Sequence, residues 1–256
     1  MKRILVIADN HAGHLFGLCL KQFKPPIESP WFSKVIEWQE KTAPWFKKEI
    51  DKVRPFDALI WNGDALDGKG ERSGGTELLT SDRIDQIQIA KDIYEFINPP
   101  TAHMIYGTPY HSGREEDWER VLARELGIDI GSHSWIECEG VTIDFKHKVS
   151  GSVIPHGRRT GPERARLWNR LWAERSLQPK ADLIVRSHIH YYGYSGDADG
   201  AVITTPCLQG FTKYGAKECE GTTDFGFITI DCEGGNFTWT AHLMDLKFSA
   251  AKAVKL

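Results

Sequence analysis

The sequence predicts an α/β protein in which strands and helices alternate early and strands gather late. Three observations indicate this class: short β-type apolar runs, longer stretches with helical spacing, and polar residues directly after the apolar runs. A chain of 256 residues is long enough to bury a sizeable core. We therefore expect a single domain over residues 1–256, with a tail at 248–256 that frays.

The predicted strands are short runs rich in apolar and β-branched residues, bounded by charged or turn residues. They cover 4–8, 58–62, 102–106, 141–145, 183–186, 201–205, 226–230 and 237–243. The predicted helices are longer stretches with apolar residues at helical spacing, and they cover 31–53, 77–97, 115–126 and 162–177. Because the last strands follow one another without helices, we expect mainly antiparallel pairing there.

The composition excludes several classes of protein. The apolar fraction is 41% and the charged fraction 26%, which is ordinary for a globular protein. Nine Trp and twelve Phe residues exclude disorder over most of the length, because such side chains belong to a packed interior. The formal net charge of −3 provides no overall positive field, so contact with nucleic acid would need a local basic groove.

The cysteines and the first residues favour a cytoplasmic location. The five cysteines are an odd number and form no C-x-x-C pair, which disfavours both a disulfide framework and a cysteine-rich zinc site. The apolar run near Met1 ends at Asp9 after five residues, which is too short for a secretory core or a membrane span. We expect no targeting segment and no membrane partner.

Histidines and aspartates follow five successive predicted strands. Because ligands bind at the carboxyl ends of strands in open α/β sheets, we expect these side chains to meet. The segments are Asp9-Asn10-His11, Gly63-Asp64-Ala65-Leu66-Asp67, Gly107-Thr108-Pro109-Tyr110-His111, His147, and His188-Ile189-His190.

These residue types in this order predict a site for two divalent metal ions. Two cations about 3.5–4 Å apart need several imidazoles and carboxylates and one oxygen that bridges them. In the Asp-x-His and His-x-His segments, alternate side chains of an extended chain face the same way. Each motif alone is more often a turn or a surface pair, but their joint occurrence is not expected by chance. Mixed ligation favours manganese, with iron, zinc or nickel as alternatives.

At these motifs the sequence resembles the calcineurin-like metallophosphoesterase superfamily. Its motifs run Asp-x-His, Gly-Asp-x-x-Asp, Gly-Asn-His-Asp/Glu, a solitary His after a strand, and Gly-His-x-His, and the resemblance spans residues 4–190. It implies a four-layer αββα sandwich with a dinuclear metal site at the strand carboxyl ends. It also implies one metal held by Asp9, His11, Asp64 and His190, and a second held by Asp64, His147 and His188. Asp64 would bridge the two, and His111 would stabilise and protonate the leaving group.

The sequence departs from this pattern at two motifs. The third motif is longer by two residues and lacks the Asn that binds the second metal, so Thr108 or water would complete a weaker site. This variant is similar to one in phage-encoded members. The fifth motif has Ser187 where Gly is usual, which we expect to change little. The solitary histidine is either His147, which ends a clear strand and is favoured, or His156.

The implied activity is metal-dependent phosphoester hydrolysis by a hydroxide that two metals activate, with Asp64 and His111 as the catalytic residues. Asp67 is expected to orient the ligands or to cap the following turn. Arg158 and Arg159 are candidates for binding phosphate, because arginine forks match phosphate oxygens. The four arginines that follow, at 164, 166, 170 and 175, either contact phosphate or a nucleic-acid backbone or, as we favour, form a solvated helix face interleaved with glutamates.

The residues leave the substrate open between phosphodiesters and phosphomonoesters. A DNA-repair-type nuclease of the same fold is one alternative, with nucleic acid as the partner. A regulatory or scaffold protein that binds metal without turnover is another, and the missing Asn supports it. Fold and metal site do not separate these, because both are shared across functions.

Overall fold

The computed structural model describes residues 1–113, 116–210, 212, 222–246 and 253. The predicted tail lies outside these residues apart from Ala253, and so does Cys219. The chain forms two sheets. One has six strands in the order β11-β10-β1-β2-β3-β4, and the other has five in the order β5-β6-β7-β9-β8.

The first sheet is mixed. Four strands run parallel to their neighbours: β1 (Lys2–Ile7), β2 (Ala58–Asn62), β3 (Ala102–Ile105) and β4 (Asp129–Gly131). The antiparallel hairpin of β10 (Gly226–Glu233) and β11 (Asn236–Leu243) extends the sheet beyond β1. β1 and β2 are nearly continuous apolar runs because both faces of their sheet are covered.

The second sheet has a parallel centre and antiparallel edges. The centre consists of β6 (Val141–Lys148), β7 (Leu183–Ser187) and β9 (Gly200–Thr204), which pair in parallel. The edges are β5 (Ser134–Cys138) and β8 (Gly193–Asp197), each antiparallel to its neighbour. The parallel centre places the carboxyl ends of β6 and β7 side by side, which matters for the site.

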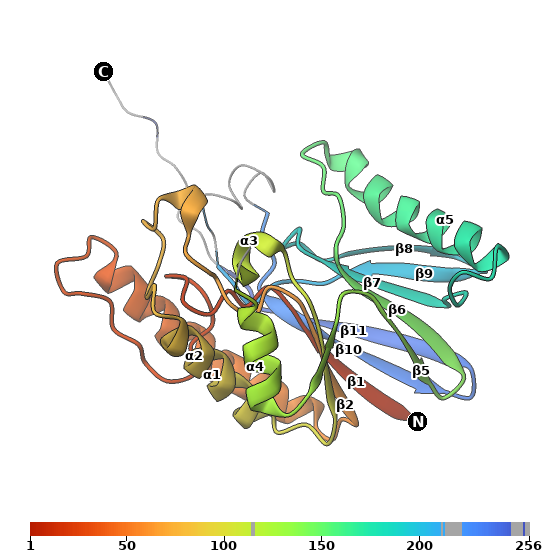
Figure 1. The fold of residues 1–256 in the computed structure, drawn as a ribbon, viewed down its shortest axis with the longest axis horizontal. Helices are drawn as coiled ribbons and strands as arrows, with labels where there is room; N and C mark the ends of the chain where they lie inside the picture. Colours follow the sequence, from red (N-terminus) through yellow and green to blue (C-terminus); the bar gives the residue numbers. More distant parts are fainter. Residues whose placement is uncertain (114–115, 211, 213–221, 247–252, 254–256) are drawn as a thin grey trace.

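Helices cover the outer face of each sheet (Figure 1). The first sheet carries α1 (Phe32–Val53), α2 (Arg83–Ile97) and α4 (Trp118–Leu126), and the second carries α5 (Thr160–Glu174). Three short helical turns complete the described chain: η1 (Glu71–Ser73), α3 (Pro109–Ser112) and η2 (Pro155–Arg159). None of the described helices combines the length and the apolar character that a membrane span requires.

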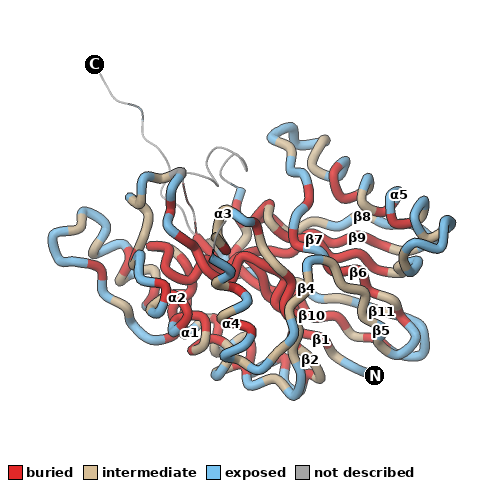
Figure 2. The backbone as a smooth tube through the Cα atoms, viewed as in Figure 1, coloured by how far each residue is buried: buried red, intermediate tan, exposed pale blue. Residues whose placement is uncertain are grey.

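Two apolar cores hold these layers together. Leu5 and Trp61 pack with Phe46 of α1 between the first sheet and its helices. Val6 packs with Phe145 between the two sheets. The layers therefore follow the order helices, sheet, sheet, helix, and buried backbone runs through the strands of both sheets (Figure 2). The predicted α/β class with two sheets and covering helices is confirmed.

The structure corrects several predicted elements. The strands β4, β5 and β8 were not predicted, because β4 is three residues long and β8 carries two glycines in five positions. α2 begins at Arg83 instead of residue 77, because the Asp82 side chain accepts a hydrogen bond from the Ile84 amide at 2.7 Å and caps the helix there. The late strands are antiparallel at β10 and β11, whereas β9 pairs in parallel with β7.

Candidate metal centre

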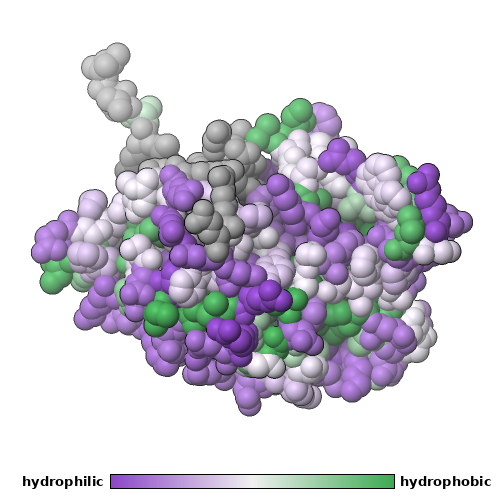
Figure 3. Space-filling model, in the orientation of Figure 1, coloured by the Kyte–Doolittle hydropathy of each residue, from purple (hydrophilic) through white to green (hydrophobic). Residues whose placement is uncertain are grey.

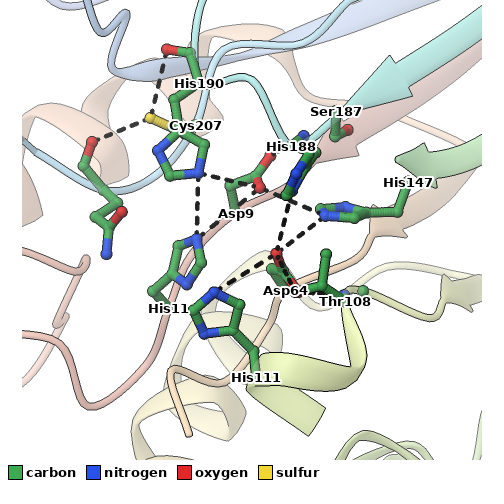
Figure 4. A network of polar contacts seen from close by, with 12 residues as sticks. Asp9, His11, Asp64, Thr108, His111, His147, Ser187, His188, His190 and Cys207 are labelled. Carbon is green, nitrogen blue, oxygen red and sulfur yellow. Dashed lines mark hydrogen bonds and ion pairs between the residues drawn. The ribbon is translucent and has the colours of Figure 1, made fainter. Parts of the chain in front are cut away.

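The predicted site residues meet at the edge where the carboxyl ends of both sheets come together (Figure 4). The first sheet contributes residues after β1, β2 and β3, and the second contributes one residue of β6 and two after β7. Ligand atoms within 4.8 Å of one another form three groups: Asp9, His11 and His190; His11, Asp64 and His111; and Asp64, His147 and His188. All six predicted ligands therefore lie in one cluster, together with His111.

The backbone at this edge adopts left-handed conformations, which residues other than glycine rarely adopt. Positive φ angles occur at Asp9 (51°), His11 (47°), Asp64 (48°), His188 (77°) and His190 (55°). Each such residue costs about 1–3 kcal/mol of strain, and strain of this kind gathers at functional sites. The left-handed turns are what direct these side chains from the strand ends into one space.

Two glycines make room for the cluster. Gly63 has a φ of 89°, and a Cβ there would clash with the His147 ring. A Cβ on Gly107 would overlap the carboxylate of Asp64. The glycines of the second and third motifs are thus required because neighbouring side chains approach their backbone closely.

The first group is centred on Asp9. Its Oδ1 atom lies 3.3 Å from Nε2 of His190 and 3.9 Å from Nε2 of His11. The two Nε2 atoms of His11 and His190 are 3.3 Å apart. These are the separations expected between atoms that share one metal at about 2.0–2.2 Å.

The second group is centred on Asp64. Its Oδ2 atom lies 3.0 Å from Nε2 of His147 and 3.9 Å from Nδ1 of His188. Nε2 of His147 is also 3.8 Å from Oδ1 of Asp9, so the groups adjoin. Asp64 belongs to two of the three groups, which is the position that a bridging carboxylate would need.

The cluster attracts positive charge. Burial raises the pKa of Asp9 and of Asp64, but the charge of His147 on each of them lowers it below the usual value. Burial lowers the pKa of His147, yet the two carboxylates raise it to about 10. The two carboxylates therefore favour positive charge where these residues converge.

The donor set fits divalent metals. Oδ1 of Asp9 is buried and accepts no hydrogen bond from the part of the chain that the structure describes. Nδ1 of His147 donates to the Asn62 carbonyl at 2.7 Å, which leaves its Nε2 lone pair for the cluster. Imidazole and carboxylate ligands in this mixture suit manganese, iron or zinc.

His111 lies on α3 at the side of the cluster. Its Nδ1 donates to the Asp67 carbonyl at 2.7 Å, and its Nε2 is 4.0 Å from Oδ2 of Asp64. The Asp67 carboxylate lies 3.3 Å from Nδ1 of His11. Asp67 therefore contacts the Nδ1 atoms of both His11 and His111. Its role in orienting these histidines stays a prediction.

Thr108 contacts Asp64 in the structure. Its amide donates to Oδ1 of Asp64 at 2.6 Å, and its hydroxyl donates to the same atom at 3.1 Å. The hydroxyl is thus used to fix the carboxylate, and its predicted role as a weak metal ligand stays untested.

The Ser187 hydroxyl also forms a hydrogen bond. It accepts from the side-chain amide of Asn62 at 2.7 Å and so links β7 to β2.

The alternative histidine and the two arginines lie further out. His156 is exposed on η2 and belongs to none of the three groups, whereas His147 is buried in the cluster. The Arg158 guanidinium lies 4.5 Å from the centre of the Tyr191 ring. Arg158 and Arg159 line a cavity of about 240 Å³. Three tyrosines that follow His190 in the chain also line it: Tyr191, Tyr192 and Tyr194.

Sequence reasoning missed Glu119. This buried residue of α4 accepts hydrogen bonds from the Ala65 amide at 3.0 Å and from the Gly107 amide at 2.8 Å. It thereby joins the loops that carry Asp64 and Thr108. Burial and the charge of Asp64 raise the pKa of Glu119 to about 7. An acidic residue in the first turn of a helix is common, so no sequence signal distinguishes it.

No protein-family model and no curated protein matches the sequence. Solved structures do match. Vps29 from Entamoeba histolytica, complexed with zinc, aligns with 94% of this chain and 92% of its own at 14% identity and a TM-score of 0.51. An archaeal phosphodiesterase aligns over 94% and 99% at 13% identity with a TM-score of 0.49. A predicted phosphoesterase from Streptococcus pneumoniae aligns over 94% and 98% at 11% identity with a TM-score of 0.39.

These findings define the class of the protein by its fold. The two sheets and their covering helices form the architecture of a metallophosphoesterase fold, and the likeness to Vps29 agrees with this. The chain has the fold of the calcineurin-like metallophosphoesterase superfamily, as the resemblance of its motifs implied.

Proposed function

We propose that the protein is a metal-dependent phosphoester hydrolase of the calcineurin-like superfamily. The observation that carries this proposal is the convergence of two buried carboxylates and several imidazoles at one strained edge shared by both sheets. Burial of this many ionisable groups is costly unless a cation balances them. Their spacing and chemistry support two divalent ions, with manganese favoured and iron, zinc or nickel as alternatives.

The proposed ligands are those that the resemblance implies, and two of the observed groups support them. Asp9, His11 and His190, which form one group, would hold one ion together with Asp64, and the group of Asp64, His147 and His188 would hold the other. When bound, a metal pair supplies activation of a water molecule and neutralises charge on phosphoryl oxygens. Thr108 keeps the Asp64 carboxylate in place through its amide and hydroxyl.

His111 is proposed to protonate the leaving oxygen. Because its Nδ1 donates to the Asp67 carbonyl, its Nε2 faces the cluster. The protonated ring can then donate from Nε2 as charge develops on the leaving group. Arg158 and Arg159, which line the cavity beside Tyr191, are proposed to bind further phosphate oxygens, because guanidinium groups match them.

One observation favours a second candidate, a metal-binding regulatory or scaffold protein without turnover. Thr108 stands where the superfamily has an Asn, and its hydroxyl bonds to Asp64.

We also propose a cytoplasmic location, because the cysteines within the described residues are free thiols, which suits a reducing compartment.

The test is a metal-dependent activity screen. Metal-loaded protein would be assayed with manganese on an aryl phosphodiester, an aryl phosphomonoester, and single- and double-stranded DNA. We expect turnover of at least one substrate, lost on chelation and restored by manganese. His156→Ala serves as a matched control and should retain activity. Metal binding without turnover of any substrate would establish the scaffold function instead.

A further inference from the structure

A second candidate site lies on the outer face of the second sheet, away from the metal centre. Successive side chains of strand β6 point to opposite faces of the sheet. Phe145 faces the core between the sheets, and His147 faces the metal cluster. The side chains between and beside them line a cavity beneath α5: Asp144, Lys146 and Lys148. This cavity has a volume of about 370 Å³, within the range of small-molecule sites.

The cavity is cationic. Lys146, Lys148, Arg164 and Arg186 line it, with Asp144 as its carboxylate. Within the described residues, no carboxylate lies within ion-pairing distance of the two lysines or of Arg164. The positive charge is therefore available to an anionic ligand.

A buried network forms the base of the cavity. Nη1 of Arg186 donates to Oδ1 of Asp144 at 2.7 Å and to the Asp144 carbonyl at 3.0 Å. Nε2 of His133 lies 2.8 Å from the same carboxylate oxygen. The charge of Asp144 is thus already satisfied. Nη1 of Arg186 also donates to the Val185 carbonyl at 2.9 Å, so the buried guanidinium lines the cavity in a fixed orientation.

Two exposed tryptophans form one wall. Trp168 and Trp172 are 51% and 37% exposed, and their rings stack with centroids 5.9 Å apart and planes 22° apart. The Arg175 guanidinium lies over the Trp172 ring, 5.4 Å from its centre. Among the described residues, Trp172 is the ring that stacks on Trp168, which leaves the other face of Trp168 for a ligand. Over α5, hydrophilic residues alternate with residues of intermediate hydropathy and with hydrophobic ones (Figure 3).

We propose that this cavity binds a nucleotide unit of single-stranded nucleic acid. A base would stack on the outer face of Trp168, and its phosphate would lie among Lys146, Lys148 and Arg164. Aromatic faces combined with cations are how proteins bind single strands without reading sequence. A protein partner is less favoured, because it would have to cover several cations that lack carboxylate partners. The proposal goes beyond hydrolysis and does not depend on it.

The test measures binding of a fluorescently labelled, phosphorothioate-linked oligothymidylate, which resists hydrolysis, to metal-loaded protein by anisotropy. The variants are Trp168→Ala, which removes the stacking face, and Arg164→Ala, which removes an exposed cation. Leu167→Ala is the matched apolar control, since Leu167 is 57% exposed on the same helix but does not line the cavity. Lys180→Ala is the matched exposed charge control.

We expect each cavity variant to weaken binding by about tenfold, and both controls to bind as the wild type does. Arg164→Ala should also reduce the dependence of log Kd on log salt by about one. Competition by thymidine monophosphate at comparable concentration would identify a free nucleotide as the ligand, whereas competition by oligomers alone would identify a strand.

Unchanged binding in both cavity variants would overturn the proposal. So would an equal loss in Leu167→Ala, because that would indicate a general apolar contact surface of the kind that binds proteins. The variants must keep wild-type melting temperatures and wild-type hydrolysis of the aryl phosphodiester. If the wild-type protein hydrolyses the aryl phosphodiester but does not bind the oligonucleotide, the proposed cavity site alone is refuted. If it binds the oligonucleotide but hydrolyses no substrate, the proposed catalysis alone is refuted.

Discussion

The metal centre and the cavity beneath α5 share strand β6 but are built in opposite ways. The metal centre is buried, its ionisable side chains face one another, and five of its residues have positive φ. The cavity is open, and its aromatic rings are exposed. Of its cations, Arg186 pairs with Asp144, whereas Lys146, Lys148 and Arg164 have no carboxylate partner among the described residues. The difference teaches how one strand can serve two kinds of proposed site: strained backbone fixes inward-facing ligands on one face, and exposed charge with a stacking face stays accessible on the other.

The largest effect is expected for Asp64→Asn. A neutral amide cannot hold two cations together as a carboxylate does, so we expect loss of bound metal and a fall in turnover of about 10³-fold or more. Metal analysis and the aryl phosphodiester assay measure this. Oligonucleotide binding at the cavity should persist. Near-normal turnover with two metals retained would remove Asp64 from the proposed role.

His111→Ala should lower turnover by about 10²–10⁴-fold, the range for a positioned acid–base group, while metal content stays nearly intact. The reason is that His111 faces the cluster from α3 through Nε2 without being one of the proposed ligands. Steady-state kinetics and metal analysis on the same preparation separate the two quantities. Loss of a metal would instead make His111 a ligand.

Asp144→Asn tests the base of the cavity. Removing this carboxylate leaves buried Arg186 without its partner, which costs about 3–5 kcal/mol of stability near neutral pH. Burial raises the pKa of Asp144, but the bond to His133 and the charge of Arg186 lower it below its usual value. This stabilisation is therefore present above the unfolded pKa and is lost as pH falls through the folded one. Urea unfolding at neutral and strongly acidic pH should show the difference between the proteins shrinking with acidity.

Glu119→Ala should destabilise the protein by about 2–4 kcal/mol, because it leaves the buried amides of Ala65 and Gly107 without an acceptor. Activity should fall as well, since both loops position the Asp64 carboxylate. Glu119→Gln is the matched control and should recover part of the stability, because its carbonyl oxygen can accept one of the two bonds. Equal stability in Glu119→Ala and the wild type, from thermal and urea unfolding, would show that these bonds contribute nothing.

The smallest effect concerns the two metal sites themselves. Without the Asn of the third motif, the second ion should bind more weakly than the first. Titration of metal-free protein with manganese should then give two unequal steps, with activity following the weaker one. Thr108→Ala offers a comparison, because it removes the hydroxyl that bonds to Asp64. Equal affinities at both sites would show this interpretation of residues 107–111 to be wrong.

Much of the fold and the site could be predicted because local signals were strong. β1 and β2 are apolar runs with few alternatives, and Asp9 and Asp64 follow them directly. β8 could not be predicted, because its Gly-Tyr-Ser-Gly-Asp sequence has little intrinsic preference and is held by pairing with β9. The α5 cavity was missed for a similar reason: the sequence favours a solvated helix face for Arg164, and only the packing of α5 on the second sheet makes that face the wall of a cavity.

The sequence by itself determined which residues are proposed to hold metal, because ligand types and their order after strands are local properties of the chain. Only the tertiary structure decided which of them face one another. It separated buried His147 from exposed His156, placed Glu119 beneath two loops far from it in sequence, and bonded the Thr108 hydroxyl to Asp64. The physical reason is that such contacts depend on how two sheets pack across a common edge, and no short segment encodes that packing.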